Sequence, residues 1–363
     1  MKAFVTGGTG FTGRRVVRRL IERGYDVTCL VRRPETAADL ENLGATLVKG
    51  NITAPESMRQ GMTGADVVFH TAAWCELGLT PIAAERMARV NIDGTENVLG
   101  LAVELGVPRI VYTSTMAVLG DTHCAVVDET YRRDSPFQSA YDRTKYWAHQ
   151  VAQRYIDQGG PVVIVMPSAI YGPGDPHPIA TLIRLMLRRR LPVAPGADTG
   201  ITAAHVEDVA EGHILAAEKG TIGQSYILGG DLLTVGDALQ IIARIAGVPA
   251  PLLLLDSNIM RPLRPLVSWL ERRFPVPEML SSETMHTLGC TWMVTSAKAE
   301  QELGYTHRSI EEGMAETISW EAAQLRKQMT PASTRWGTAA LLATTATLLV
   351  ISVNFIRGRR NRT

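Results

Sequence analysis

The feature that most constrains the fold is a glycine-rich turn near the start of the chain, "TGGTGFTG" (residues 6–13). It follows a short apolar strand predicted over Ala3–Val5 and opens a helix predicted over Phe11–Arg23. A second strand is predicted over Asp26–Val31. Strand, turn, helix and strand in this order make a βαβ unit, which requires a parallel sheet with helices packed on its faces.

The three glycines Gly7, Gly10 and Gly13 suit different tasks in a dinucleotide-binding turn. The first permits a tight turn, the second lets the backbone approach a pyrophosphate, and the third lets the helix pack closely on the strand. The helix N-terminus offers free N–H groups and a partial positive charge to the phosphates. Because the triplet lies between a strand and a helix, we expect a dinucleotide site.

The end of the second strand indicates which dinucleotide is bound. An acidic residue there would hold the ribose 2′-hydroxyl of NAD, but this chain has Arg32 and Arg33. Guanidinium groups match a 2′-phosphate with two hydrogen bonds. We therefore expect NADP, with NAD as the alternative cofactor. A pair of solvated surface arginines is the plainer interpretation.

Further alternation of strands and helices follows. Apolar strands in "ATLVKGNI", "ADVVFHTAA", "PRIVYTST" and "GPVVIVMPSAIYGPG" are separated by helical segments, among them a long helix over Glu85–Leu105. This pattern predicts an α/β fold with a Rossmann-type, doubly wound parallel sheet. We expect residues 1–167 to form the cofactor-binding domain and residues 168–330 to form a smaller substrate-binding part, interleaved with the first.

The stretch "SAYDRTKYW" places Tyr141 and Lys145 four residues apart, on one face of a predicted helix. Alone, such a pair is typical of a helix surface. A cation beside a phenol lowers the pKa of the phenol, which can then serve as an acid/base near neutral pH. The glycine turn and a hydroxyl-bearing strand accompany the pair in this chain, so we expect it to be catalytic.

The chain resembles the extended short-chain dehydrogenases/reductases of the NAD-dependent epimerase/dehydratase superfamily. The branch most similar is that of the dihydroflavonol reductases and 3β-hydroxysteroid dehydrogenases. The matching pieces stand in the family's order over roughly residues 1–330 and are "TGGTGFTG", "HTAA", "NIDGT", "YTSTMAVLG", "YDRTK", "PSAIYGPGD" and "HVEDVA".

The resemblance implies roles for individual residues. Tyr141 would be the acid/base, Lys145 its partner, and Thr115 the catalytic hydroxyl, with Ser114 beside it. Asn91 completes the catalytic set by supporting the helix beside the active site. The implied cofactor-binding residues are Gly7, Thr9, Gly10, Phe11, Thr12, Gly13, Arg32, Arg33, Asn51, Ile52, Thr71, Ala72, Ala73, Thr113, Tyr141, Lys145, Pro167 and Ser168. The residues proposed to contact the substrate are Trp74, Cys75, Thr115 and Tyr171.

Two positions depart from the family pattern. Asn51 stands where the family often has an Asp beside the adenine, and Met166 stands where many members carry an Arg. The four cysteines lie far apart, without the spacing of a disulfide framework or of a metal site, so we expect reduced thiols and no metal.

Three function classes compete. The first is hydride transfer between the nicotinamide and a carbonyl or secondary alcohol of a lipophilic substrate that is sterol-, isoprenoid- or flavonol-like. The second is a nucleotide-sugar epimerase or dehydratase, whose usual diphosphate-binding Arg is missing from "TGITAAHVEDVA". The third is a cofactor-bound accessory subunit of a membrane complex, disfavoured by the intact Thr–Tyr–Lys set. We expect the first.

The end of the sequence predicts a membrane anchor. Residues 336–356 contain no charged side chain over 21 positions, and a helix of that length rises roughly 30 Å, enough to cross a bilayer. A linker precedes this segment within residues 331–363, and a basic tail follows it. Residues 252–274 interleave apolar residues with arginines, which fits an interfacial segment or a core helix.

These features predict a membrane-associated enzyme with its catalytic domain in the cytoplasm, where NADPH and reduced thiols are found. An anchor favours a lipophilic substrate that is met in the bilayer. The net charge of +1 gives no electrostatic reason for binding nucleic acid. A homodimer and a partner in a membrane complex stay open alternatives.

Overall fold

The computed structural model divides into two compact units, residues 1–318 and 319–363. The structure describes residues 1–260, 262, 264–271, 273 and 282–328. The predicted anchor helix at residues 336–356 lies outside them. Within the described ranges, no helix combines the length and the apolar character needed to cross a bilayer.

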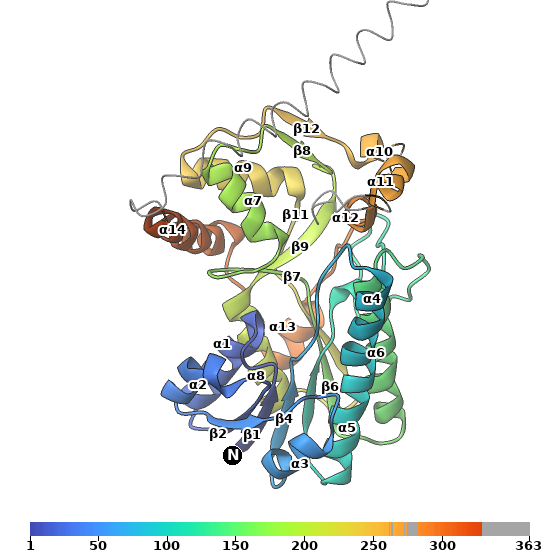
Figure 1. Ribbon diagram of the computed structural model, residues 1–363, viewed down its shortest axis with the longest axis vertical. Coiled ribbons are helices and arrows are strands. Elements are labelled where there is room, and N and C mark those ends of the chain that lie inside the picture. The colour runs from blue at the N-terminus through green and yellow to red at the C-terminus, as the bar shows by residue number, and fades with distance from the viewer. Residues whose placement is uncertain (261, 263, 272, 274–281, 329–363) are drawn as a thin grey trace, which may run out of the picture. The chain divides into compact units, whose positions relative to one another are not determined.

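A seven-stranded parallel sheet forms the centre of the first unit (Figure 1). Its strands are β1 (Lys2–Thr6), β2 (Asp26–Val31), β3 (Thr46–Lys49), β4 (Val67–His70), β5 (Ile110–Thr113), β6 (Val162–Pro167) and β10 (Ser225–Leu228). Their order is β10-β6-β5-β4-β1-β2-β3, and every neighbouring pair runs parallel. The order reverses between β1 and β4, the place where open α/β sheets bind their ligands. The predicted doubly wound parallel sheet is confirmed.

Helices cover both faces of this sheet. One layer contains α3 (Glu56–Met62), α5 (Gly94–Glu104) and α6 (Ala140–Asp157), and the other contains α1 (Phe11–Glu22), α2 (Ala38–Asn42), α8 (Val206–Lys219) and α13 (Ala297–Leu303). Successive side chains of β1 point to opposite faces of the sheet. Phe4 packs against the first helix layer and Val5 packs against the second. Two covered faces explain why the strands are continuous apolar runs.

After β6 the chain forms a smaller part with two short sheets. One contains β7 (Ala169–Tyr171), β9 (Gly200–His205) and β11 (Asp231–Thr234), and the other contains β8 (Val193–Pro195) and β12 (Leu253–Leu255). Its helices are α7 (Pro178–Leu187), α9 (Val235–Ala246), α10 (Ser257–Met260), α11 (Arg264–Glu271), α12 (Ser282–Thr287) and α14 (Ile310–Gln328), whose last residues belong to the second unit. From within this part β10 returns to the main sheet. The predicted boundary at residue 167 stays a prediction.

The long helix predicted over Glu85–Leu105 is present, and it contains a π-helical turn that the sequence analysis did not predict. α4 (Pro81–Ala88) passes into a π-helical turn at Arg89–Asp93, and α5 continues from there. Such a turn widens the helix by one residue and often marks a functional position. Here the widened turn contains the buried Asn91.

Candidate active site

The glycine turn between β1 and α1 leaves no room for side chains at two of its positions. Gly7 has a φ of +78°, and a Cβ there would lie 2.5 Å from the backbone nitrogen of Ala72. A Cβ at Gly13 would lie 2.2 Å from the carbonyl oxygen of Gly7. These distances are too short for non-bonded atoms, so both positions require glycine. The start of α1 therefore lies directly against the end of β4.

The N-terminus of α1 is suited to an anion. Its N-cap residue Gly10 makes no side-chain capping hydrogen bond, and the first turn contains no acidic residue. The first N–H groups of a helix have no intrahelical partner and carry partial positive charge. The residues of the turn thus fit the pyrophosphate of a dinucleotide. Thr9 is exposed beside it, Thr12 is half-buried, and the Phe11 ring lies 4.6 Å from the Arg15 guanidinium carbon.

The residues expected around the adenosine end lie after β2 and β3. Arg32 and Arg33 are exposed, and neither guanidinium forms an ion pair with another residue that the structure describes. The Asn51 side-chain oxygen accepts a hydrogen bond from the backbone N–H of Thr53 at 3.2 Å. Ile52 is buried. Two unpaired cations beside the pyrophosphate turn are consistent with an additional phosphate.

The residues expected around the nicotinamide end follow β4, β5 and β6. The Thr71 hydroxyl donates to the carbonyl oxygen of Thr6 at 2.7 Å, which fixes the segment that continues into Ala72 and Ala73. Thr113 shares a hydrogen bond of 2.9 Å with His213. Ser168, directly after Pro167, is buried, and its hydroxyl has no partner among the described residues. A buried polar group without a partner fits a bound cofactor amide.

Tyr141 lies in the first turn of α6. A capping box begins this helix, because the Ser139 hydroxyl accepts from the Asp142 N–H at 3.1 Å and Asp142 accepts from the Ser139 N–H at 2.8 Å. The Tyr141 hydroxyl interacts with the Thr115 hydroxyl and with the Cys75 thiol.

Ser114, the neighbour of Thr115, is engaged elsewhere, since its hydroxyl shares a 2.9 Å hydrogen bond with His149. Thr115, as the resemblance implied, is therefore the hydroxyl beside the phenol.

Lys145 is buried, and its ammonium group is held by β5. It donates to the carbonyl oxygen of Thr113 at 2.8 Å and to the hydroxyl of Tyr112 at 3.4 Å. Burial lowers the pKa of Lys145 to about 8. Sequence reasoning missed Tyr112, because nothing local distinguishes it from an ordinary strand residue.

Burial also sets the protonation of Tyr141. It raises the pKa of the phenol well above its usual value, the negative charge of a Cys75 thiolate would raise it further, and the hydrogen bond from Thr115 opposes the change. The lowering of this pKa that was expected from Lys145 and the oxidised nicotinamide stays a prediction, and in the chain by itself the effect of burial is the larger. The reason is that removing a phenolate from water costs more than nearby polar groups return.

Asn91 acts on the loop beside Tyr141. Its amide nitrogen donates to the Trp74 carbonyl oxygen at 3.0 Å and to the Thr144 hydroxyl at 3.1 Å, and its oxygen accepts from the Trp74 N–H at 2.8 Å. The side chain thus connects this loop to α6. Such contacts are those of a positioning residue, and the supporting role expected for Asn91 stays a prediction.

The residues expected to contact substrate are divided. Trp74 is half-buried and Cys75 exposed in the loop at the phenol. Tyr171 instead has 1% of its surface exposed and packs in the core with Ile310 and Met314. That burial leaves Tyr171 no surface for a substrate, which corrects the sequence analysis.

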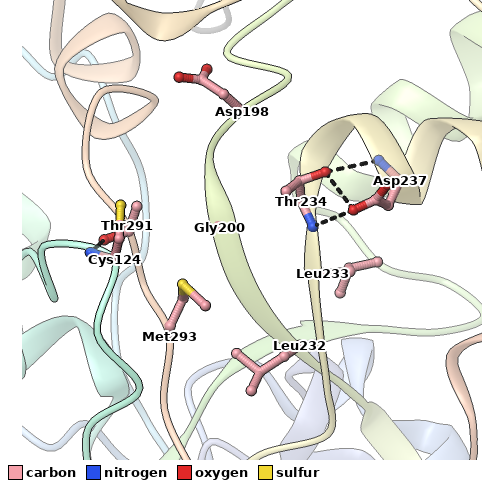
Figure 2. Close-up of a pocket in the computed structure, with 9 residues that line it drawn as sticks. All are labelled: Cys124, Asp198, Gly200, Leu232, Leu233, Thr234, Asp237, Thr291 and Met293. Atoms are coloured by element: carbon pink, nitrogen blue, oxygen red, sulfur yellow. Dashed lines mark hydrogen bonds between the residues drawn. The ribbon is translucent and has the colours of Figure 1, made fainter.

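Neither of the two cavities described includes Tyr141 or Lys145. The first, of about 230 Å³, is shown in Figure 2 beside β9 and β11. In it, Thr234 and Asp237 hydrogen-bond each other at the start of α9. The second, of about 470 Å³, lies beside α6 and includes His149 and Met166.

Comparison with known proteins identifies the family. A sequence profile of the NAD-dependent epimerase/dehydratase family matches residues 3–229. The chain belongs to this family. It is an NAD(P)-dependent enzyme of the extended short-chain dehydrogenase/reductase type, as the resemblance implied.

Curated relatives span nearly the whole chain. A Synechocystis sp. protein named "Putative dihydroflavonol 4-reductase" is 35% identical over 335 residues, which is 87% of this chain and 93% of the relative. The 4-hydroxy-2-methyl-3-oxo-4-farnesyl-3,4-dihydroquinoline-1-oxide ketoreductase of Stigmatella aurantiaca is 32% identical over 85% of this chain and 92% of its own. The 3-beta-hydroxysteroid dehydrogenase of Mycolicibacterium neoaurum is 29% identical over 88% and 91%.

A solved structure of the protein gox2253 has the same fold. It superposes with a TM-score of 0.78 at 35% identity and covers 89% of this chain and 98% of its own. The two chains thus share one fold over 89% of this chain and 98% of gox2253.

Proposed function

We propose that this enzyme transfers hydride between NADP and a carbonyl or secondary alcohol of a lipophilic substrate, with Tyr141 as the acid/base. One observation carries the proposal. The half-buried Tyr141 has its hydroxyl against the Thr115 hydroxyl, just after β5, and it lies on the same helix as the buried Lys145. The phenol, the hydroxyl it contacts and a lysine one helical turn further along α6 are the groups that proton transfer to a carbonyl oxygen requires.

In reduction, a cofactor held by the glycine turn would supply the hydride for the carbonyl carbon. The Thr115 hydroxyl holds the carbonyl oxygen, and Tyr141 donates its phenolic proton to that oxygen as negative charge develops there. The raised pKa keeps this proton on Tyr141 at neutral pH, so the phenol is ready to act as an acid. The Lys145 ammonium then stabilises the phenolate that forms. Oxidation runs through the same steps in reverse.

Arg32 and Arg33 support NADP as the preferred cofactor. Both are exposed at the end of β2, where the sequence has no acidic residue for a ribose 2′-hydroxyl. Their guanidinium groups can bind a 2′-phosphate through paired hydrogen bonds.

The names of the relatives support a lipophilic substrate, since one names a farnesyl-bearing ketone and another a steroid. The run before "HVEDVA" supports it as well. It contains no Arg of the kind that sugar-nucleotide enzymes commonly carry shortly before this motif, and its Ile201 pairs with Trp292 and packs against the apolar core. No described contact favours the sugar-nucleotide alternative.

Membrane association is part of the proposal. From the residue before β12 to the middle of α11, several large apolar side chains are exposed: Leu252 (89%), Leu253 (51%), Ile259 (52%) and Trp269 (44%). Exposed apolar side chains of this size are typical of surfaces that contact lipid or protein. They support an interfacial role for the described part of residues 252–274, in addition to the anchor proposed at residues 336–356.

The substrate class is tested with the purified full-length enzyme in detergent. NADPH oxidation is followed with a steroid ketone, an isoprenoid ketone and UDP-glucose, and UMP binding is measured by calorimetry. The proposal predicts turnover of at least one lipophilic ketone and no UMP binding. Tight UMP binding together with conversion of UDP-glucose alone would replace it by the sugar-nucleotide alternative.

A further inference from the structure

One carboxylate connects three segments around Tyr141 that are distant in sequence. Glu283, in α12, accepts a hydrogen bond from the backbone N–H of Gly78 at 2.7 Å with one oxygen. With the other oxygen it accepts from the backbone N–H of Ala140 at 3.1 Å. We name these two contacts the Glu283 clasp.

The contact at Ala140 lies directly beside the proposed acid. Ala140 is the first residue of the 18-residue helix α6 and precedes Tyr141. Its N–H has no partner within the helix, and the N-terminus of a helix favours negative charge. The capping box provides acceptors for the N–H groups of Ser139 and Asp142, and Glu283 provides the acceptor for the N–H of Ala140.

The contact at Gly78 fixes the far end of the loop that faces Tyr141. Asn91 holds the near end at Trp74 through two hydrogen bonds to its backbone. Cys75 lies between these two anchors, and its thiol interacts with the Tyr141 hydroxyl. The loop thus keeps its place at the phenol through one buried amide and one carboxylate.

We infer that Glu283 is a positioning residue that holds loop 74–78 and the start of α6 in the arrangement through which substrate reaches Tyr141. A carboxylate has two acceptor oxygens and serves both N–H groups at once, whereas an amide has only one acceptor oxygen. This inference rests on the proposed function. Charge-assisted hydrogen bonds of this kind are stronger than neutral ones, so the clasp is not replaceable by a neutral side chain.

Kinetics of the full-length enzyme test the inference first. Glu283→Gln is compared with Glu104→Gln, a control that removes a carboxylate paired with Arg59 on the surface. We expect Glu283→Gln to raise KM for the carbonyl substrate about tenfold, the effect of losing one hydrogen bond to a charged group. The kcat and the Kd of NADPH should stay within about twofold. A KM equal to that of the control overturns the inference.

Thiol reactivity gives a second readout that needs no turnover. Cys75 and Cys124 are exposed, so alkylation by N-ethylmaleimide can be followed at both in one digest by mass spectrometry. With the clasp removed, Cys75 should react several times faster in Glu283→Gln than in Glu104→Gln, relative to Cys124. Unchanged Cys75 reactivity contradicts the clasp, even if no ketone substrate is found.

Glu283→Asp covers the case in which Glu283→Gln is unstable, because it keeps the charge but is too short to reach both N–H groups. It should show the same faster alkylation of Cys75. If the clasp behaves as expected while no carbonyl substrate is ever turned over, the proposed function fails and the positioning role stands.

Discussion

Replacing Gly10 by Ala tests whether the glycine turn binds the pyrophosphate. Gly10 is exposed, its φ of −79° suits Ala, and a Cβ there would lie 3.2 Å from the Gly7 carbonyl oxygen. The free energy of unfolding should therefore fall by no more than about 1 kcal/mol, the usual cost of Ala at an N-cap. The added methyl group would keep a phosphate oxygen from the N–H groups of α1. Losing one hydrogen bond to a charged group costs about 1.5–3 kcal/mol, which weakens binding about 10- to 150-fold.

Gly13→Ala is the contrasting variant. A Cβ there would lie 2.2 Å from the Gly7 carbonyl oxygen and 2.7 Å from the Thr71 hydroxyl, so α1 would have to move. Forcing atoms into a packed site costs about 1–3 kcal/mol. Urea unfolding gives the stability, and fluorescence titration gives the Kd of NADPH. We expect Gly10→Ala to lose binding alone and Gly13→Ala to lose binding and stability. A Gly10→Ala protein that binds NADPH as tightly as the wild type refutes the reasoning.

Three further predictions concern the cofactor, the buried lysine and the membrane. Changing Arg32 and Arg33 to Ser should weaken NADPH binding at least about tenfold and leave the Kd of NADH within twofold, in the same titration. Equal losses of affinity for both cofactors would contradict a contact between these arginines and the 2′-phosphate. Burial lowers the pKa of Lys145 from 10.5 to about 8, so between these pH values the unfolded chain binds more protons and stability rises with pH. Relative to Lys145→Met, the wild type should gain about 1 kcal/mol of unfolding free energy from pH 7 to pH 9 in urea, and parallel pH profiles would contradict a buried ammonium. A chain ending at Thr330 should leave the membrane fraction on centrifugation; if it sediments fully with membranes, the attachment lies elsewhere, with residues 252–274 the first to test.

The local parts of the fold could be predicted from the sequence. The glycine turn could be predicted because only glycine fits at Gly7 and Gly13. The apolar runs of β1 and β6 predict a sheet covered on both faces. Thr115 could be assigned from its place in a motif, and the structure sets its hydroxyl beside Tyr141.

What could not be predicted depends on distance and burial. Glu283 and Ala140 are 143 residues apart, and no pattern in either segment indicates their contact. The raised pKa of Tyr141 follows from how deeply the phenol is buried, which residue spacing does not reveal. The π-helical turn at Asn91 was missed because no residue in it marks a widened turn, and its contact with Trp74 joins segments 17 residues apart.

The most direct measurement of the central claim is the turnover of Tyr141→Phe beside its affinity for NADPH. Phe keeps the ring and its packing and removes only the hydroxyl that would donate the proton. We predict that the Kd of NADPH stays within about twofold, while kcat falls about 10²- to 10⁴-fold, the usual contribution of a general acid. Tyr141→Phe turning over a lipophilic ketone at the wild-type rate would contradict the account.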